Sequence, residues 1–490
     1  MAGLPRAEAI ATALLLLACD GAGASSAMDA RPEPAPTVPS RPPAPITEPS
    51  APSGPAATPE ATVAAVASSD APPVDDHPRS IGRRRARRAQ MVYVEPRLGT
   101  AFRGKIPRNQ IFELQAHVTG DDCGGEGWGR IGDAAYVCLQ HTEPVEDEPS
   151  MLPATLVDGL APFFYARLRP KDGSGQQPPA PRYRSRRAMA VQAPPEDYLE
   201  PEHDYAFVER RRFHRQTVLT TETHRTVRER DVKRMKPSEF RGRDIAAHPI
   251  PAGTVMMWSI EWPYAIVHAE PSEESPELDR LPLHAEALAH DRPPDERGEH
   301  DAWIPVARPE AGSTSGWVLA EQVRHWIPMP PPDGITADEL WIDIDLAQQM
   351  LALRRGPAVE FLTLISSGNG EHPTPVGLFR LESKWAFADM RSRAGDEDTY
   401  FVEGVPWVQY FRGRYALHGT FWHNRFGRRT SHGCINLSAH DARWVYERTW
   451  PAAKPGWLMI NEHAREPGTT LRIRKGTRPP PDRRGPLPGA

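Results

Sequence analysis

Short runs of β-prone residues, separated by glycine and proline turn signals, recur along the chain after Met91. Between Met91 and Glu146 these runs are "MVYVEP", "GKIPRNQIFELQAHV", "GWGRIG" and "AAYVCLQ". Closely spaced strands of this kind are typical of small barrels and sandwiches. The pattern predicts a mainly β protein, with a small β domain over residues 91–146.

The segment before this domain lacks the side chains of a folded core. From Ala30 to Asp76 the sequence is mostly Pro, Ala, Ser, Thr and Glu, so burial cannot offset the entropy of ordering the backbone. Residues 19–90 are therefore predicted to be a disordered tether. The arginine run at its end, Arg83 to Arg88, is interpreted as a solvated linker, with contact to anionic lipid or wall polymer as the alternative.

The first residues have the pattern of an export signal. Arg6 precedes an apolar run from Ala9 to Ala18, which is too short for a membrane span of about 20 residues. Residues 1–18 are therefore predicted to be a signal peptide. The segment "LLAC" resembles the lipobox of bacterial lipoproteins, which implies a lipid on Cys19, with an ordinary cleaved signal as the alternative. We expect an exported lipoprotein, anchored in a membrane and facing the periplasm or cell wall.

Export changes the interpretation of the other cysteines, because disulfides persist outside the cytoplasm. Cys123 and Cys138 flank a glycine-rich, hairpin-like segment, and we predict a disulfide that contributes about 3 kcal/mol in the chain-entropy model. Two independently buried thiols are the alternative. Cys434 is then left unpaired, which in an exported protein indicates a reactive thiol. The net charge of −5, from many charges of both signs, favours no nucleic-acid partner.

The middle of the chain contains further β-prone segments. Residues 150–245 are an uncertain β-containing region, and residues 246–328 are predicted to be another β domain with a long loop from Ser272 to His300. The cysteine before "GWGRI" in the first β domain, and "GWV" in this one, resemble features of bacterial SH3-like domains. That resemblance implies two modules that position an enzyme on a wall or substrate.

The last domain, predicted over residues 335–476, is mostly β with one short helix. "LWIDIDL", "AVEFLTLIS", "GWLMIN" and "TLRIRK" are predicted strands. "SAHDARWVYERTWP" is predicted to be the helix, with Ser438 as its N-cap and Asp441 as the capping-box partner. Residues 477–490 are predicted to be a disordered tail.

The unpaired Cys434 lies in a segment that can activate a thiol, "HGTFWHNRFGRRTSHGCINL". A cysteine attacks as the thiolate, and a neighbouring imidazole both lowers its pKa and accepts its proton. Gly433 permits a tight turn that could aim the amides of Gly433 and Cys434 at a developing oxyanion.

Four motifs in this domain, in order, resemble the YkuD family of L,D-transpeptidases: "ISSGNG" at 365–370, "PTPVGLF" at 373–379, "HGT" at 418–420 and "SHGCIN" at 431–436. The spacing from His418 to Ser431 is at the short end for this family. The resemblance covers about Leu340 to Arg474 and implies a β-sandwich or barrel domain that needs no cofactor.

The resemblance also implies a reaction. Cys434 would attack the third residue of a peptidoglycan stem tetrapeptide and release D-Ala, and an amine of a second stem would take the thioester to give a 3→3 cross-link. Attack by water or by a protein amine would make the chain a carboxypeptidase or a protein-to-wall attachment enzyme. His418 would be the base, oriented by the carbonyl of Gly419. Ser431, His432 and Gly433 would shape the pocket and oxyanion site.

Other residues of this segment are candidate substrate contacts. Arg425, Arg428 and Arg429 could hold stem-peptide carboxylates, with a solvated loop as the alternative. Thr420 and Asn436 are further candidates, although a structural hydrogen bond is the default for Asn436. The aromatic candidates for lining the cleft are Trp407, Tyr410 and Trp422.

Two alternatives give these residues other roles. His418, His432 and Cys434 could bind zinc, but a fourth ligand is not evident, and we predict no metal. The chain could also be a non-catalytic wall-binding lipoprotein with a degenerate catalytic domain.

Overall fold

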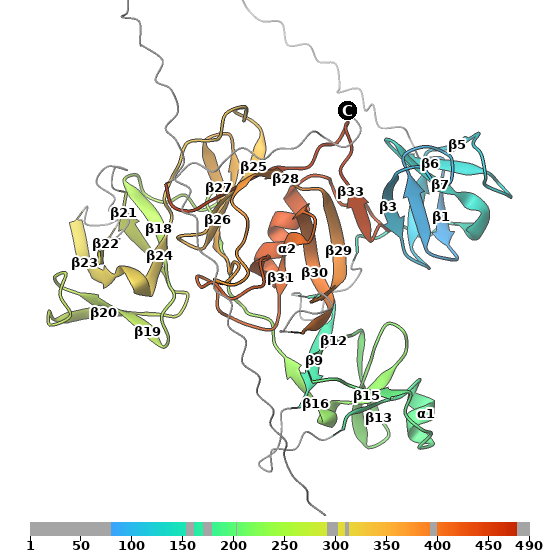
Figure 1. Ribbon diagram of the computed structural model, residues 1–490, viewed down its shortest axis with the longest axis horizontal. Helices are drawn as coiled ribbons and strands as arrows, with labels where there is room; N and C mark the ends of the chain where they lie inside the picture. The colour runs from blue at the N-terminus through green and yellow to red at the C-terminus, as the bar shows by residue number, and fades with distance from the viewer. Residues whose placement is uncertain are drawn as a thin grey trace, which may run out of the picture. The chain divides into compact units, whose positions relative to one another are not determined.

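The computed structural model describes residues 80–152, 161–169, 179–201, 203–291, 302–308, 313–392 and 399–477 (Figure 1). Over these residues the fold is mainly β, as the sequence predicts, with two α-helices, α1 (Arg186–Ala190) and α2 (Ala439–Arg448). No helix in these ranges is long and apolar enough to cross a membrane. The predicted signal peptide, Cys19, residues 19–79 of the tether and residues 478–490 of the tail lie outside the described residues.

The first β unit consists of a three-stranded sheet and one end of a thirteen-stranded sheet that continues into the last domain. One has the strand order β4-β1-β8 and the other includes β3-β2-β7-β6-β5. The bounds are β1 (Gly82–Ala86), β2 (Gln90–Tyr93), β3 (Phe102–Ile106), β4 (Ile111–Leu114), β5 (Ala116–Val118), β6 (Trp128–Gly132), β7 (Ala135–Cys138) and β8 (Thr142–Val145).

The arginine run is part of this unit, so its interpretation as a solvated linker is wrong and the tether prediction extends too far. Gly82–Ala86 is strand β1, paired with β4 and β8. Arg84 is 5% exposed and makes two hydrogen bonds to the Glu126 carboxylate, of 2.7 and 2.8 Å. Arg85 pairs with Asp147 at 2.5 Å. Acidic partners distant in sequence therefore let part of a basic run form the central strand of a sheet.

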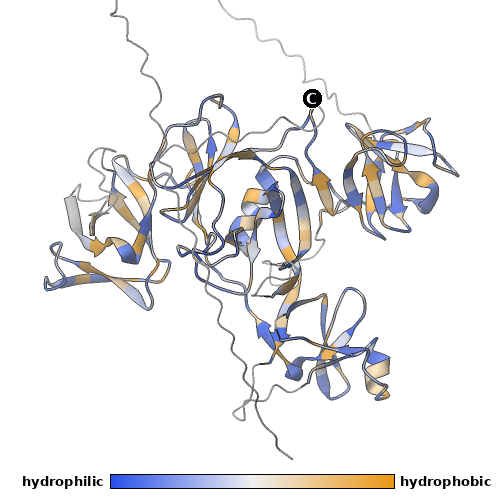
Figure 2. Ribbon diagram, viewed as in Figure 1, coloured by the Kyte–Doolittle hydropathy of each residue, from blue (hydrophilic) through white to orange (hydrophobic). Residues whose placement is uncertain are grey.

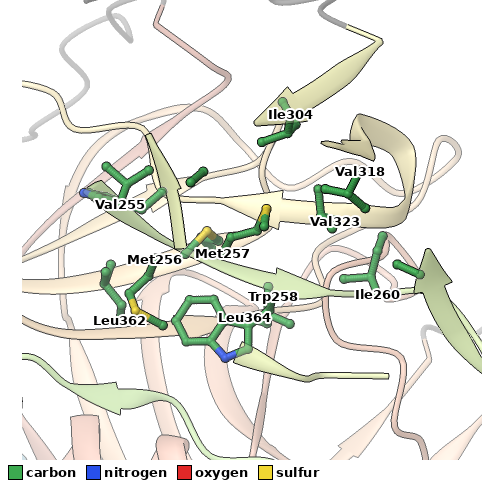
Figure 3. Packing of buried hydrophobic residues seen from close by; sticks show 14 of the residues in the cluster. Val255, Met256, Met257, Trp258, Ile260, Ile304, Val318, Val323, Leu362 and Leu364 are labelled. Carbon is green, nitrogen blue, oxygen red and sulfur yellow. The ribbon is translucent and has the colours of Figure 1, made fainter. Parts of the chain in front are cut away.

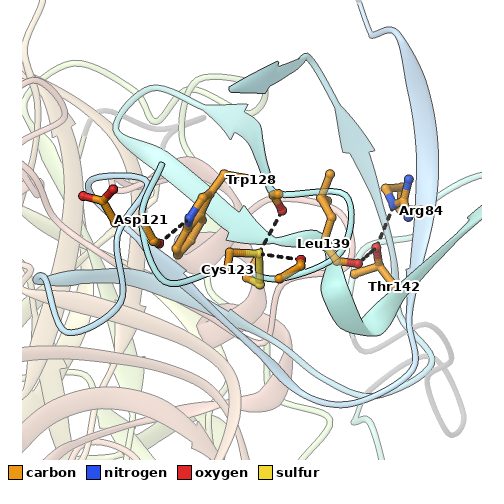
Figure 4. Close-up of a disulfide and its surroundings, with 9 residues drawn as sticks. Arg84, Asp121, Cys123, Trp128, Leu139 and Thr142 are labelled. Carbon is orange, nitrogen blue, oxygen red and sulfur yellow. Dashed lines mark hydrogen bonds between the residues drawn. A yellow bond between two sulfur atoms is a disulfide. The ribbon is translucent and has the colours of Figure 1, made fainter. Parts of the chain in front are cut away.

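Cys123 and Cys138 are joined in a disulfide with an S–S distance of 2.08 Å (Figure 4). Cys138 ends β7 and lies opposite Trp128 of β6. The Trp128 indole N–H donates to the carbonyl of Asp121 at 2.8 Å, which holds the loop containing Cys123 against the hairpin.

The second β unit follows, with the one-turn helix α1. Its strands are β9 (Phe164–Leu168), β10 (Pro181–Arg182), β11 (Asp197–Tyr198), β12 (His203–Phe207), β13 (Glu209–Phe213), β14 (Gln216–Thr220), β15 (Thr226–Arg228) and β16 (Val232–Met235). β12 lies between β9 and β30 (Phe401–Arg412), so this unit continues a sheet of the last domain.

The third β unit is a seven-stranded sheet with the order β20-β19-β23-β22-β21-β18-β24. Its strands are β18 (Thr254–Ser259), β19 (Tyr264–His268), β20 (Glu277–Pro282), β21 (Glu286–His290), β22 (Trp303–Arg308), β23 (Ser313–Leu319) and β24 (Val323–His325). The predicted long loop from Ser272 to His300 is therefore wrong over β20 and β21. Most side chains of β20 are exposed, so its backbone pairing leaves no hydrophobic signal in the sequence.

Two sheets form the last domain, whose apolar residues lie along the strands (Figure 2). One, with the order β17-β27-β26-β25-β34-β28, also takes in β17 (Arg243–Asp244). The other includes β30, with β29 and β31 beside it and β32 beside β31. The bounds are β25 (Leu340–Asp345), β26 (Met350–Arg355), β27 (Ala358–Leu364), β28 (Gly377–Arg380), β29 (Ser383–Arg391), β31 (Tyr415–Thr420), β32 (Ile435–Ser438), β33 (Met459–Asn461) and β34 (Thr470–Arg474).

Helix α2 begins as the sequence predicts. The Ser438 hydroxyl accepts the N–H of Asp441 at 3.1 Å, which confirms Ser438 as the N-cap. The predicted capping-box role of Asp441 is wrong, because its carboxylate accepts hydrogen bonds from the Thr363 hydroxyl and the Gly242 amide instead. The helix is thereby fixed to β27 and to the segment before β17.

The third β unit and the last domain share one hydrophobic core (Figure 3). Met256 and Trp258 of β18 pack in the same cluster as Leu362 and Leu364 of β27. Phe426, from the segment between the two candidate site motifs, belongs to this cluster and is 1% exposed. Burial of such apolar surface couples the third unit to the loop beside Cys434.

Candidate active site

His418 lies on β31, and Cys434 directly precedes the neighbouring parallel strand β32. β31 pairs with β32 so that Leu417 lies opposite Ile435 and His418 opposite Asn436. Ala416 shares a face of β31 with His418, and Cys434, directly before β32, packs against the hydrophobic cluster that contains Ala416. Leu417 and Ile435 point to the other face, into the domain core. The backbone therefore presents the thiol and the imidazole as diagonal neighbours.

His418 is buried, and its ring orientation is fixed by its own strand. Its Nδ1 is 3.1 Å from the carbonyl oxygen of Gly419, so Nδ1 carries the proton and Nε2 is left as the basic nitrogen. Burial lowers the pKa of His418 to about 4. The imidazole is therefore neutral near pH 7 and able to accept a proton.

The Cys434 thiol faces a cavity of about 960 Å³. Burial raises the pKa of this thiol, while a hydrogen bond from the Ala416 amide and the charge of Arg414 oppose that effect. The Sγ atom is 3.6 Å from the carbonyl oxygen of Arg414. The cavity is lined by His203, Asp389, Met390, Arg391, Ser392, Thr399, Tyr400, Phe401, Tyr410, Arg414 and Cys434.

The turn before Cys434 is closed by hydrogen bonds from both sides. The Ser431 hydroxyl donates to the carbonyl of Cys434 at 2.5 Å and accepts the N–H of Gly433 at 3.1 Å. The Gly433 amide is thus already used, contrary to its predicted place in an oxyanion site, and the Cys434 amide is the candidate donor. Gly433 has a φ of +110°, and a Cβ there would lie 2.7 Å from the Tyr415 ring. Glycine is therefore required both by the left-handed backbone and by the lack of space for a side chain.

The upstream motifs support this turn. Thr374, in "PTPVGLF", donates its hydroxyl to the carbonyl of Gly433 at 2.9 Å and accepts the Gly368 N–H at 2.9 Å. Gly368, in "ISSGNG", also forms a parallel bridge with Ser431. The four sequence motifs therefore meet around a single turn.

The three arginines of the intervening loop do not line the cavity. Arg428 donates to the Ile260 carbonyl at 3.0 Å and pairs with Glu261 at 2.9 Å, both in the third β unit. Arg429 donates to the Leu346 carbonyl at 3.0 Å. Arg425 is exposed. Arg428 fixes the loop to the third β unit and Arg429 fixes it to the residue after β25. The sequence could not indicate these contacts, because the partners lie far away along the chain.

The other candidates have mostly structural surroundings. The Asn436 amide lies 3.0 Å from Nε2 of His423, which gives Asn436 a local partner. Thr420 is fully buried and Trp407 is 4% exposed, and neither is among the residues that line the cavity. The Trp422 ring lies 5.8 Å from the His418 ring. Tyr410 does line the cavity with Cys434.

His432 is exposed, and its ring lies 4.8 Å from that of His372 and 5.1 Å from that of Tyr400. Within the described ranges, no three His, Cys, Asp or Glu side chains form a group that could hold a metal ion.

Four residues of this site went unnoticed in the sequence: Thr374 as a support for the turn, and His203, Arg391 and Arg414 on the cavity wall. Thr374 lies in a recognised motif and could have been identified from it. His203 had no sequence signal, because it reaches the cavity through the pairing of β12 with β30.

Comparison with known proteins places this site in a family. Residues 339–470 match the YkuD family, described as the L,D-transpeptidase catalytic domain. A 132-residue segment is 28% identical to the Bacillus subtilis (strain 168) protein YciB, provisionally named an L,D-transpeptidase, and covers 24% of this chain and 63% of that relative. The chain thus spans under two thirds of that relative's length.

Solved L,D-transpeptidases also resemble part of the chain. A mutant of the Enterococcus faecium enzyme is 21% identical with a TM-score of 0.22, over 28% of this chain and 50% of that one. L,D-transpeptidase 3 of Mycobacterium tuberculosis is 19% identical with a TM-score of 0.23, over 32% of this chain and 73% of that one. Scores this low add nothing to the family match. Residues 339–470 of this chain are an L,D-transpeptidase catalytic domain of the YkuD family.

Proposed function

We propose that this protein is an L,D-transpeptidase that acts on peptidoglycan stem tetrapeptides through a thioester on Cys434. The observation that carries the proposal is the placement of a cavity-facing thiol, directly before β32, next to strand β31, which holds the buried imidazole of His418. A neutral His418 beside a protonated Cys434 is the state that the two pKa shifts support near pH 7.

Acylation then moves one proton in two transfers, first to His418 and then to the leaving group. As Sγ of Cys434 bonds to the carbonyl carbon of the third stem residue, its proton moves to Nε2 of His418. The carbonyl oxygen becomes an oxyanion near the amide of Cys434. When the tetrahedral intermediate collapses, the bond to D-Ala breaks and His418 returns the proton to the departing amine. A thioester and free D-Ala result.

Deacylation reverses these roles. An amine on the third residue of a second stem attacks the thioester, gives its proton to His418, and forms a 3→3 amide bond as the Cys434 thiol is regenerated. Water would give a tripeptide, and a protein amine would give a protein attached to the wall. The reacting groups on this chain are the same in each case, so the acceptor determines the product.

The upstream segments fit an anchored wall enzyme. A lipid on Cys19 and the Pro- and Ala-rich tether would hold the catalytic domain near a membrane and facing the periplasm or wall. The β units at 80–152 and 246–328 would serve as SH3-like wall-positioning modules.

Product analysis tests the proposed function. The mature protein is incubated with purified disaccharide-tetrapeptide, and free D-Ala and muropeptides are measured. We expect D-Ala release together with a cross-linked dimer. Tripeptide without dimer would favour the carboxypeptidase, and a product seen only with an added protein amine would favour attachment. No D-Ala release with any acceptor would contradict the proposal and favour a non-catalytic wall-binding protein.

A further inference from the structure

The second β unit is joined to the strand that forms one wall of the cavity. β12 pairs in parallel with β30, with His203 opposite Phe401 and Asp204 opposite Val402. The Tyr165 hydroxyl donates to the Gly404 carbonyl at 2.8 Å, and the Ala206 amide donates to the Glu403 carboxylate at 3.1 Å. These contacts come from residues outside the family match, which begins at residue 339.

The pairing creates a row of side chains across three strands. Phe401 of β30 lies opposite both His203 of β12 and Arg391 of β29. Residues directly opposite each other in a sheet point to the same face. All three line the cavity that Cys434 also lines. The rings of His203 and Phe401 are 5.1 Å apart and tilted by 50°, so they form a continuous aromatic wall.

Arg414 connects this row to the nucleophile. Its guanidinium donates to the carbonyl of Arg391 at 2.6 Å, and its own carbonyl is 3.6 Å from Sγ of Cys434. Two guanidiniums therefore border the path from Cys434 to His203. Among the described residues, one carboxylate lines the cavity, that of Asp389, and it accepts the Gly404 amide at 2.9 Å. The guanidiniums outnumber the carboxylate among these lining residues, which favours an anionic ligand.

The His203 side chain is held in place. Its Nδ1 is 3.4 Å from the Tyr205 hydroxyl, and its Nε2 is 3.2 Å from the exposed Glu200 carboxylate. With both nitrogens engaged, the ring offers the cavity a surface for packing rather than a free donor. The wall therefore combines an apolar contact at His203 and Phe401 with charge at Arg391.

We propose that residues 161–235 complete the substrate site of the catalytic domain, with His203 and Phe401 packing on a stem peptide while Arg391 pairs with one of its carboxylates. This inference rests on the proposed function. It gives the second β unit a role in substrate recognition and makes His203 a substrate-binding residue outside the catalytic domain.

The test compares the mature protein with the variants His203→Ala and Arg391→Gln, using tetrapeptides with free and with amidated stem carboxylates. We expect Arg391→Gln to raise KM for the free acid roughly tenfold, the loss of one charge-assisted contact, and to remove the preference over the amide. His203→Ala should raise KM for both peptides, and kcat should stay within about twofold in each variant, because neither residue takes part in bond formation.

Matched controls lie elsewhere in the same unit. His214 and Arg211 are exposed on the β13–β14 hairpin and do not line the cavity, so His214→Ala and Arg211→Gln should leave both KM values unchanged. Thermal unfolding identifies any variant that fails to fold, and His203→Asn then replaces His203→Ala. Parental KM values and parental selectivity in the folded His203 and Arg391 variants would overturn the proposal.

A binding measurement separates this proposal from the proposed function. Calorimetry with Cys434→Ala needs no turnover, and adding His203→Ala or Arg391→Gln to it should weaken tetrapeptide binding. If the parent releases no D-Ala but these variants still weaken binding, the proposed reaction fails and the recognition site stands. If the parent turns over and binding is unaffected, the recognition site fails alone.

Discussion

The hydroxyl of Thr374 donates a 2.9 Å hydrogen bond to the carbonyl of Gly433 and accepts the amide of Gly368 at 2.9 Å. Thr374 is 5% exposed, so removal of its hydroxyl leaves two buried backbone groups without this partner. Because Gly433 directly precedes Cys434, this relationship connects the "PTPVGLF" motif to the position of the nucleophile.

Thr374→Val should therefore impair both stability and D-Ala release. Unsatisfied buried groups cost about 1–3 kcal/mol each, so we expect a clear decrease in the free energy of unfolding, measured by denaturant titration. We also expect a decrease in kcat of roughly tenfold or more, because small displacements of reacting groups are costly. Thr374→Ser keeps the hydroxyl and should retain most of the free energy of unfolding and most of kcat. Equal effects of the two substitutions would argue against the hydrogen bond as the cause.

Gly433→Ala should abolish activity through the backbone. A Cβ at Gly433 would lie 2.7 Å from the Tyr415 ring, at a φ of +110°. Gly413→Ala is the matched control, because Gly413 has a φ of +55° but a Cβ there would have nothing within 4 Å. We expect the control to lose at most about 1–2 kcal/mol of stability from backbone strain and to keep its D-Ala release rate. Full activity of Gly433→Ala would show that the turn tolerates rearrangement.

The pH dependence of acylation should have its acid limb near pH 4. His418 must be neutral to accept the thiol proton, and burial lowers its pKa to about 4. Activity should therefore be level at neutral pH and fall as the pH decreases through that value. Initial rates of D-Ala release between pH 3.5 and 8 measure this limb. An acid limb near the ordinary histidine pKa of about 6.5 would mean that His418 is more solvated than its position implies.

Acidification should also destabilise the fold before it protonates the base in the native state. His284 packs against Phe240 and Phe426, and burial lowers its pKa to about 4. Its unfolded value is about 6.5, so the unfolded chain binds more protons between these two pH values. The part of the free energy of unfolding that depends on a neutral His284 is present above about pH 6.5 and is lost as the pH falls through about 4.

Thermal unfolding at pH 7 and pH 5 measures this effect, and Tm should be lower at pH 5. His284→Asn removes one of the buried imidazoles, so the difference between its two Tm values should be smaller than that of the parent. An identical difference in both proteins would mean that His284 does not contribute. The pH dependence of D-Ala release should then be analysed only at pH values at which the protein remains folded.

Gly427 lies in the loop between the motifs "HGT" and "SHGCIN", and it provides a test of the packing between this loop and the third β unit. A Cβ there would lie 2.2 Å from Cγ2 of Ile260, at a φ of +90°. Gly427→Ala should displace this unit from the loop, lowering the free energy of unfolding by roughly 1–3 kcal/mol as overpacking does. Gly253→Ala, with a φ of +75° and nothing within 4 Å, is the control. Similar losses in both variants, measured by denaturant titration, would indicate backbone strain alone.

The sequence predicts the local features of this protein well. The mainly β fold and the Ser438 cap depend on short-range patterns, and both are confirmed. The four motifs of the catalytic domain lie within about 70 residues of one another, and they converge on one turn as segments of one domain.

Features that depend on distant partners were missed. Asp343 and Asp345 alternate with isoleucines as on an exposed strand face, yet both are fully buried, because Arg472 and Arg474 pair with them from the parallel strand β34. Arg84 is buried for the same reason, beside Glu126. No local pattern identifies such partners, so buried charge and the contribution of His203 to the cavity emerge only from the folded chain.

Intact-protein mass spectrometry tests the central claim most directly. The protein is mixed with disaccharide-tetrapeptide and quenched in acid at short times. We predict a mass increase equal to the tetrapeptide substrate minus D-Ala, located by peptide mapping on Cys434 and absent in Cys434→Ala. D-Ala release by Cys434→Ala, or the same adduct on another residue, would contradict a thioester mechanism at Cys434.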